Sequence, residues 1–197
     1  MSSIRPYRPS DMDDVIDICV RTGDSGADAT GKFSRSTLLP DVYALPYIRH
    51  DPSLAWVVDD GERAIGYLVA TADTREFARW FADAWWPEVV GRYRPSTSER
   101  PGERGLIESA SNSARMLVSD VDAYPAHLHI DLLPVTQGQG LGRRLIDTLI
   151  TELTVRGVAG LHLTAGASNV GAIAFYERVG FHELERDGGS VTFGKRL

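Results

Sequence analysis

Cysteine is almost absent from this chain, which has a single thiol, Cys19, in 197 residues. One cysteine excludes an intramolecular disulfide and a cysteine-based zinc site, and it is typical of proteins from a reducing compartment. No neighbour of Cys19 in the sequence would lower the pKa of its thiol, so a nucleophilic thiolate is not indicated. We therefore expect a cytoplasmic protein that uses no metal ion and forms no covalent intermediate on cysteine.

Long apolar runs and clusters of basic residues are missing as well. A membrane-spanning helix needs about 20 consecutive apolar residues, and the first residues, Met-Ser-Ser-Ile-Arg, lack the apolar core of a signal peptide. The formal net charge is −6 and the basic residues are scattered, so neither a membrane nor a nucleic acid is an expected partner. With 43% hydrophobic residues, residues 1–197 are predicted to form one globular domain.

Glycine, by contrast, is concentrated in the segment 137–142, which reads Gln-Gly-Gln-Gly-Leu-Gly. This segment separates an apolar run at 129–133 from an amphipathic run that begins near Leu141, which is the pattern of a strand, a tight turn and a helix. The backbone N–H groups of such a turn point outward with the positive end of the helix dipole behind them. We therefore expect the turn to bind phosphate.

Two familiar phosphate-binding motifs do not fit these residues. A P-loop requires a lysine followed by serine or threonine, and residues 137–142 contain no lysine. A dinucleotide fingerprint requires GxGxxG early in the chain and an acidic residue on the following strand, but the next apolar strand, 160–165, contains no acid. A glycine turn that serves only tight packing is the remaining alternative.

A second motif follows the glycine-rich segment. The first pattern is Gln137-x-x-Gly140-x-Gly142, and the second is Asn169-x-x-Ala172-x-x-Phe175-Tyr176-x-x-x-Gly180-Phe181. Together they resemble motifs A and B of the GNAT superfamily of acyl-CoA-dependent N-acetyltransferases. Residues 4–11 are similar to the first strand and first helix cap of that family. The segment 124–134 is similar to the acetyltransferase-like C-terminal domain of O-GlcNAcase and its free-standing bacterial relatives.

The resemblance implies an α/β protein with the GNAT fold, in which helices flank a single mixed central sheet. An insertion at about 74–124 would separate the third and fourth strands. Aromatic residues at helical spacing predict that it is largely helical, with one helix ending near Pro87, a polar segment at 95–103 and a second helix at 106–118. We favour core packing as the role of these aromatics over substrate binding, and a dimer surface is a third alternative.

Acetyl-CoA is the co-substrate that the resemblance implies. In the family, the strands that correspond to 126–133 and 161–165 splay apart, and the pantetheine arm continues the sheet between them. Backbone groups of Ile130, Leu132 and Leu133 would pair with that arm. Asn169 matches a residue that contacts the cofactor, although it can also be a helix N-cap. The residues expected to hold the pyrophosphate are Gln137, Gly138, Gln139, Gly140, Leu141, Gly142 and Arg143.

Three residues are the candidates for catalysis. Tyr176 matches the family tyrosine near the coenzyme sulfur, and a phenol is a suitable proton donor to a departing thiolate; the alternative is that it only packs its helix on the sheet. No glutamate occupies the strand before the loop, so we expect Asp131 to be the general base or a substrate anchor, with His129 the second candidate for the base. His127, His129 and Asp131 occupy every second position of the strand and therefore lie on one face. The alternative role for these side chains is to form hydrogen bonds with backbone groups or with one another.

The sequence thus predicts an N-acetyltransferase that passes an acetyl group from acetyl-CoA directly to a primary amine. The acceptor can be a small molecule or a protein, and a homodimer is compatible with the family. The alternative function is that of a pseudo-acetyltransferase, which binds acetyl-CoA as a regulatory or binding module and has little or no catalytic activity.

Overall fold

The computed structural model describes residues 2–93 and 99–197, and its framework is a seven-stranded sheet in the order β1-β2-β3-β4-β5-β7-β6. Only the β4–β5 pair is parallel, and the other neighbours are antiparallel. The α/β class and the mixed sheet are therefore confirmed. The strands are β1 (Ser3–Pro6), β2 (Ala55–Asp59), β3 (Ala64–Thr71), β4 (Ala126–Leu132), β5 (Gly160–Gly166), β6 (His182–Arg186) and β7 (Ser190–Arg196).

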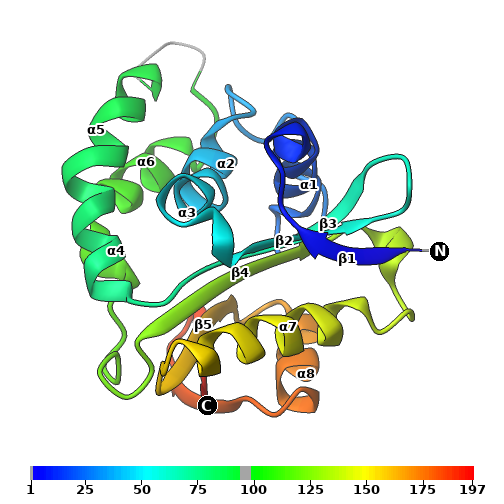
Figure 1. Cartoon of the computed structure of the whole chain (residues 1–197). Helices are drawn as coiled ribbons and strands as arrows, with labels where there is room; N and C mark the ends of the chain where they lie inside the picture. Colours follow the sequence, from blue (N-terminus) through cyan, green and yellow to red (C-terminus); the bar gives the residue numbers. More distant parts are fainter. Residues whose placement is uncertain (1, 94–98) are drawn as a thin grey trace.

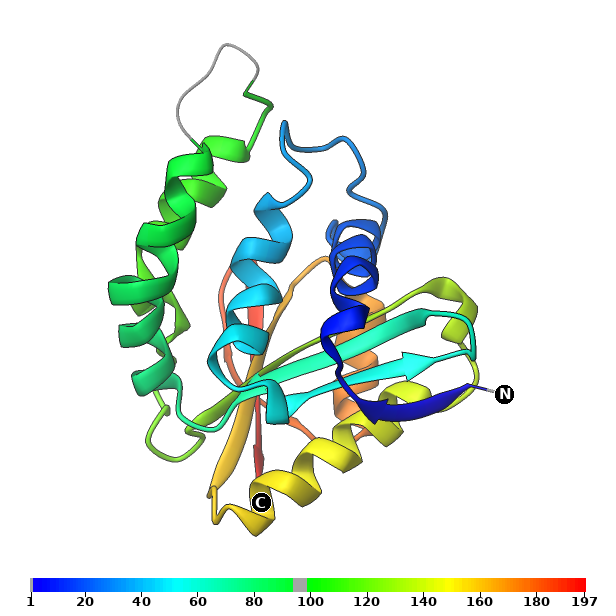
Figure 2. The ribbon, with the colours of Figure 1, turned by 45° about the horizontal axis from the view of Figure 1, so that its top comes forward.

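Helices cover both faces of this sheet (Figures 1 and 2). One face carries α1 (Met12–Thr22), α2 (Leu38–Tyr43) and α3 (Leu45–His50), and beside them α4 (Thr74–Trp80), α5 (Trp86–Val89) and α6 (Glu103–Ser111). The other face carries α7 (Leu141–Val155) and α8 (Val170–Arg178). Short 3-10 turns occupy Pro9–Asp11, Pro52–Leu54, Val90–Tyr93, Ser113–Met116 and Pro134–Thr136, and a π-helical segment spans Phe81–Trp85. No helix in the described part of the chain is long and apolar enough to span a membrane.

The α7 helix, which follows the glycine-rich segment, is amphipathic as predicted. Leu145, Leu149 and Leu153 recur at intervals of four, so they lie on one stripe, and each has no exposed surface. This stripe packs against the sheet, where α7 contacts β1 and β3. Burial of the stripe anchors the helix and thereby holds its N-terminus beside the end of β4.

The insertion between β3 and β4 is largely helical, but its helix boundaries differ from the prediction. The first helix continues through the π-helical segment into α5, which holds Pro87 in its first turn, where a missing N–H is tolerated, and which ends at Val89, close to the predicted end near Pro87. The second predicted helix begins earlier, at Glu103, and it stops at Asn112, whose φ of −103° and ψ of 89° are not helical. Residues 95–98 of the predicted polar segment lie outside the described residues.

The aromatic side chains of the insertion are mainly core residues. Phe77 and Phe81 have no exposed surface, and Trp85 is only 7% exposed. The Phe77 ring stacks on that of Tyr47 in α3 with centroids 4.3 Å apart. The indole N–H of Trp85 donates a hydrogen bond to the Asp41 carbonyl in α2. These contacts support the core-packing interpretation and attach the insertion to α2 and α3, whereas the dimer alternative stays untested.

The pairing of β4 with β5 is short. The two strands are in register only at Ala126↔Leu161 and His127↔His162, although β4 continues to Leu132 and β5 to Gly166. Beyond this point each strand has one edge with no neighbouring strand, so its backbone N–H and C=O groups on that side are free to bind something else.

Candidate functional site

The cleft opens where β4 and β5 separate, and it has two connected parts. The "Asp131 cavity" has a volume of about 500 Å³ and lies on the side of α1 and α2. The "loop cavity" has a volume of about 670 Å³ and lies against the glycine-rich segment 137–142. The residues that line both parts are Ser25, Gly26, Ile130, Leu132, Asn169, Ala172 and Tyr176.

The wall of the loop cavity is mostly backbone. Gly138 and Gly140 have φ angles of 74° and 68°, a conformation that favours glycine, and a Cβ atom on either would meet nothing within 4 Å. Gly140 is the N-cap of α7, so the N–H groups of 141–143 have no partner within the helix. A Cβ atom on Gly142 would lie 3.1 Å from both Leu132 and Phe175, so this glycine also permits close packing. The segment thus presents N–H groups at a bare helix N-terminus.

The loop residues predicted from the sequence do not all face this cavity. Gln139 does not line it, and its side-chain amide donates to the Val135 carbonyl over 2.8 Å. The role expected of its backbone N–H group stays a prediction. Arg143 does line the cavity, and its guanidinium also donates to the carbonyl of Arg178 at the end of α8. Of the predicted loop residues, the cavity is lined by Gln137, Gly138, Gly140, Leu141, Gly142 and Arg143.

The structure corrects the prediction for Leu133 in β4. Ile130 and Leu132 line both cavities, and the pairing of their backbone groups with the pantetheine arm stays a prediction. Leu133 lines neither, because its N–H donates to the Ile65 carbonyl and its own carbonyl accepts from Thr136. Both of its backbone groups are therefore used within the protein.

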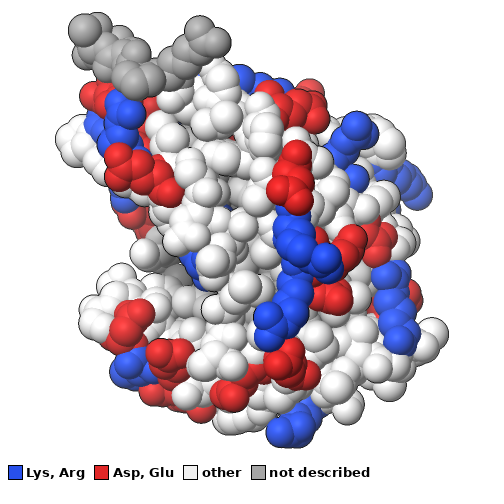
Figure 3. All heavy atoms as spheres, turned by 90° about the vertical axis from the view of Figure 1, so that its left-hand side faces the viewer, with Lys and Arg blue, Asp and Glu red and all other residues white. Residues whose placement is uncertain are grey.

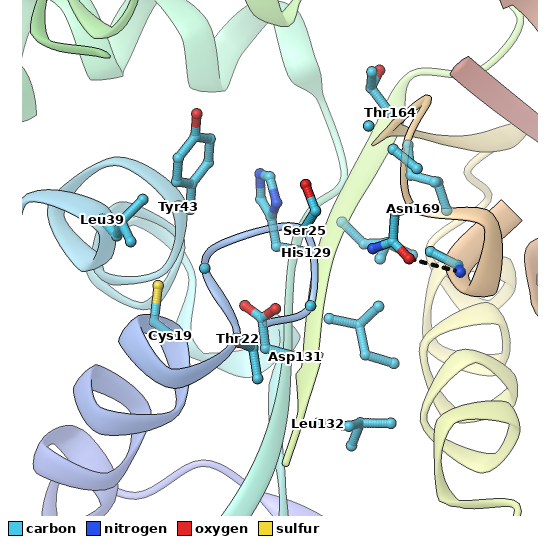
Figure 4. Close-up of a pocket in the computed structure, with 18 of the residues that line it drawn as sticks. Cys19, Thr22, Ser25, Leu39, Tyr43, His129, Asp131, Leu132, Thr164 and Asn169 are labelled. Atoms are coloured by element: carbon cyan, nitrogen blue, oxygen red, sulfur yellow. Dashed lines mark hydrogen bonds between the residues drawn. The ribbon is translucent and has the colours of Figure 1, made fainter. Parts of the chain in front are cut away.

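Asp131 lies in the cavity named after it, close to α1 (Figure 4). The Tyr67 hydroxyl, from β3, donates a hydrogen bond to its carboxylate. Burial raises the pKa of Asp131 above its ordinary value, and hydrogen bonds from Tyr67 and Thr22 partly oppose that rise. Cys19 is close by, and burial raises the pKa of its thiol, with the Asp131 charge acting in the same direction. The thiol therefore stays protonated, as the sequence indicated.

His129 and His127 share the strand face with Asp131, as the alternation predicted. The His129 ring lies edge-on to the rings of Tyr43 and Tyr47, with centroids 5.3 and 5.1 Å away. Burial lowers the pKa of His129 to about 3, with the Arg115 charge contributing, so the ring is neutral near pH 7. A neutral ring with so low a pKa is a weak base, which makes Asp131 the stronger of the two candidates.

Both ring nitrogens of His127 form hydrogen bonds within the protein. The Thr74 hydroxyl donates to the Pro125 carbonyl over 2.7 Å, so its oxygen accepts from Nδ1 of His127, also over 2.7 Å. Nε2 of the same ring is then an acceptor, and the Tyr47 hydroxyl donates to it over 2.6 Å. The ring is buried with both nitrogens used, so the alternative role of internal hydrogen bonding holds for His127.

Tyr176 and Asn169 connect the two cavities from α8. Burial raises the pKa of Tyr176, and the negative charge of Asp131 adds to the rise, so the phenol keeps its proton near pH 7. Its ring also packs 5.8 Å from Phe181 and from Phe193, which means that the packing role and the cleft position coexist. Asn169 caps α8, because its Oδ1 accepts the N–H of Ala172 over 3.0 Å. Figure 4 shows the Asn169 side chain across β4 from Asp131.

Several cleft residues were not identified from the sequence. Thr22, Ser25, Phe33 and Tyr43 line the Asp131 cavity, and Tyr67 binds Asp131. They come from α1, the loop after it, α2 and β3, and no spacing in the sequence connects them with the glycine-rich segment. In residues 2–93 and 99–197, no group of three His, Cys, Asp or Glu side chains is placed to hold a metal ion.

Comparison with known proteins identifies relatives of both the cleft region and the whole chain. The sequence pattern of the Acetyltransferase (GNAT) family matches residues 114–181. The [Ribosomal protein bS18]-alanine N-acetyltransferase of Escherichia coli K12 is 58% identical over 50 residues, which are 25% of this chain and 34% of that protein. Protein O-GlcNAcase of Rattus norvegicus is 20% identical over 187 residues, 93% of this chain but 20% of that protein. The chain thus spans only a third or less of these curated relatives.

Solved structures extend the likeness to the complete fold. The crystal structure of SsHAT superposes with a TM-score of 0.91 at 44% identity, covering 99% of this chain and 98% of that one. The PaiA N-acetyltransferase of Thermoplasma acidophilum, solved in complex with coenzyme A, has a TM-score of 0.62 at 14% identity, covering 100% and 99% of the two chains. This second likeness concerns the fold alone.

Proposed function

The chain belongs to the GNAT acetyltransferase family, and from the geometry of its cleft we propose that it transfers an acetyl group from acetyl-CoA to a primary amine. The observation that carries this proposal is the separation of β4 from β5 directly beside the glycine-rich segment. A strand edge and a helix N-terminus thereby border one continuous cleft. An acyl-coenzyme A thioester has amides that can pair with the strand edge and a pyrophosphate that can bind at the helix N-terminus.

The loop cavity is the proposed site for the pyrophosphate. The N–H groups of 141–143 have no partner within α7, and the positive end of the helix dipole lies behind them. The absence of side chains at Gly138 and Gly140 lets an anion approach the backbone. The edges of Ile130 and Leu132 would then pair with the pantetheine amides, which directs the thioester toward the Asp131 cavity.

Asp131 is the proposed general base. An amine attacks a thioester only in its neutral form, so a proton must leave the nitrogen, directly or through a water molecule. The raised pKa of Asp131 makes its carboxylate a better proton acceptor than an ordinary aspartate. The hydrogen bond from Tyr67 fixes the orientation of the carboxylate toward the cavity. His129, with its pKa lowered to about 3, is the second candidate.

Tyr176 is the proposed acid. It lines both cavities, and the thioester end of the ligand and the acceptor would meet where these cavities adjoin. Its raised pKa keeps the phenol protonated and therefore able to donate to a departing thiolate. With a proton acceptor and a proton donor both at the cleft, direct transfer requires no acyl group on the enzyme.

Two measurements on the wild-type protein test this proposal. Acetyl-CoA should raise the melting temperature by mass action, because it binds the folded protein only. A panel of polyamines, aminosugars, amino acids and lysine peptides, with detection of the free thiol, should then reveal an acceptor. Binding without turnover of any acceptor above the hydrolysis background would favour the pseudo-acetyltransferase, and failure to bind acetyl-CoA would overturn both functions.

A further inference from the structure

Arg115 is a cation near the cleft that forms no ion pair within residues 2–93 and 99–197. It follows α6 in the insertion, and its Nε atom is buried without a hydrogen-bond partner among those residues. Its guanidinium lies 5.6 Å from the centre of the Tyr43 ring, a contact that supplies no hydrogen-bond acceptor to Nε.

Four titratable groups on which the Arg115 charge acts are neutral. Burial lowers the pKa of His127 and of His129, and the Arg115 charge lowers both further. Burial raises the pKa of Tyr43 and of Tyr47, and the same charge opposes the rise. All four groups are therefore uncharged near pH 7, so none compensates the guanidinium. A partly buried cation without a partner is unfavourable, and an anion would relieve it.

Arg115 borders a side cavity that is continuous with the cleft. This "Arg115 cavity" has a volume of about 80 Å³, and Leu128, His129, Leu163 and Thr164 line both it and the Asp131 cavity. Figure 3 shows a face of the molecule with a hollow in which a few basic atoms are visible. A cavity as small as the Arg115 cavity takes a small group such as a carboxylate rather than a larger part of the acceptor.

Asp131 and Arg115 line different cavities. Arg115 lies beside Tyr43 and lines the Arg115 cavity with His127 and His129, whereas Asp131 lines the Asp131 cavity and not the Arg115 cavity. His129 lines both cavities and lies roughly 7 Å along the strand from Asp131. An amine at Asp131 and an anion at Arg115 would therefore occupy different cavities. The amine and carboxylate of a simple α-amino acid share one carbon and are too close together. Tyr43 and Phe33 line the Asp131 cavity and would present aromatic surface to the part of the acceptor between its amine and its carboxylate.

From this juxtaposition we infer that Arg115 binds a carboxylate of the acceptor, so the substrate is a primary amine with a carboxylate at its far end. The inference rests on the proposed function, because it assigns the acceptor of the same cleft. The planar guanidinium donates two parallel hydrogen bonds to a carboxylate, which lysine does not reproduce. Arg115 acts in specificity and positioning, and the chemistry stays with Asp131 and Tyr176.

A matched pair of probes tests the inference. We would titrate 4-(aminomethyl)benzoate and 4-(aminomethyl)benzamide by calorimetry into the protein with coenzyme A present. The wild type should bind the acid on the order of ten-fold more tightly than the amide, as a charge-assisted hydrogen-bond pair provides. Arg115→Gln should remove this preference while leaving the amide affinity unchanged, and Arg115→Lys should restore only part of it.

Arg75→Gln is the control, because Arg75 is an exposed residue of the same insertion and pairs with Asp122. It should keep the full preference for the acid. The inference would be overturned if the wild type bound the acid and the amide equally, if it did not bind the acid, or if Arg115→Gln kept the preference for the acid. If Arg115→Gln does not fold, the comparison of acid and amide in the wild type still decides. If the protein transfers acetyl groups to the amide but does not prefer the acid, the inference on Arg115 fails and the proposed function stands. If the protein prefers the acid but transfers no acetyl group, the anion site at Arg115 stands and the proposed function fails.

Discussion

The two walls of the cleft are built in different ways. The loop cavity is formed largely by one continuous segment and the helix that follows it, and its binding groups are backbone N–H groups. The Asp131 cavity is formed by side chains that are distant in sequence, since Tyr67 and Asp131 are 64 residues apart. Backbone binding needs only a local conformation, whereas a side-chain pocket needs several elements packed together. The first wall is therefore evident in the sequence and the second is not.

The two walls also differ in their electrostatics. The helix N-terminus supplies partial positive charge that does not titrate, so its attraction for an anion should vary little with pH. The Asp131 wall depends on a carboxylate whose pKa is raised by burial, so its function should change with pH. The proposed division is thus between a pH-insensitive binding wall and a pH-sensitive catalytic wall.

The largest expected effect comes from a charge placed in the loop wall. Gly140→Asp should abolish the binding of acetyl-CoA measured by calorimetry, because the new carboxylate would point into open space beside the bare helix N-terminus and repel the pyrophosphate. Asparagine tolerates the same left-handed backbone, so Gly140→Asn should lose less affinity than the aspartate variant.

Gly157 provides the matched control for that change. It ends α7 with a φ of 73° and nothing within 4 Å of a Cβ atom, so Gly157→Asp imposes similar backbone strain at the opposite end of the helix. It should bind acetyl-CoA as the wild type does. A folded Gly140→Asp variant with unchanged affinity would contradict the role of the loop wall.

The next largest effect is expected at Asp131. Asp131→Asn should lower kcat by about 10³-fold, within the range for loss of a general base, with little change in acetyl-CoA affinity. Because the pKa of Asp131 is raised, the carboxylate forms as pH rises through that pKa, so wild-type kcat should rise with pH on a limb that the variant lacks. A pH–rate profile with the same limb in both proteins would move the base to another group, with His129→Gln the next variant to test.

A smaller effect on the rate is expected at Tyr176. Tyr176→Phe should lower kcat by about 10²-fold while acetyl-CoA affinity stays within a few-fold, because a hydroxyl that acts in the transition state affects rate rather than ground-state binding. The phenyl ring keeps the contacts with Phe181 and Phe193, so the melting temperature should change little. Full activity in this variant would reduce Tyr176 to a packing residue.

The smallest effect is expected at Asn169, where the two walls meet. Asn169→Ala should lower the free energy of unfolding by about 1 kcal/mol, because α8 loses its N-cap. Asn169→Ser keeps a capping oxygen and should recover most of this loss in a denaturant titration. If both variants lose acetyl-CoA affinity to the same extent, Asn169 contacts the ligand as well; unchanged affinity in both would leave it as a cap alone.

The predictions that succeeded depend on local patterns. The stripe of Leu145, Leu149 and Leu153 indicated α7, and the glycines before it indicated the turn, because helix periodicity and left-handed backbone are properties of neighbouring residues. The GNAT resemblance and the mixed sheet are confirmed for the same reason, since the motifs around the loop are short and contiguous. The roles of the individual site residues remain predictions.

One prediction failed because it depended on a longer-range contact. Leu133 follows Leu132 in an apolar strand, and only the pairing with Ile65 shows that its N–H is used. The second helix of the insertion was expected at 106–118, but it begins at Glu103 and stops at Asn112, whose backbone is not helical.

The sequence by itself determined the strand, glycine-rich turn and helix that form the loop wall, because each depends on backbone conformations and spacings within about 20 residues. Tertiary structure alone decided the other wall. It placed the Tyr67 hydroxyl on Asp131, and it used both nitrogens of His127. It also brought Arg115 from the insertion to the edge of the cleft, where its Nε atom has no hydrogen-bond partner in the described part of the chain. Burial and the proximity of distant charges set these properties, and neither exists until the chain has folded.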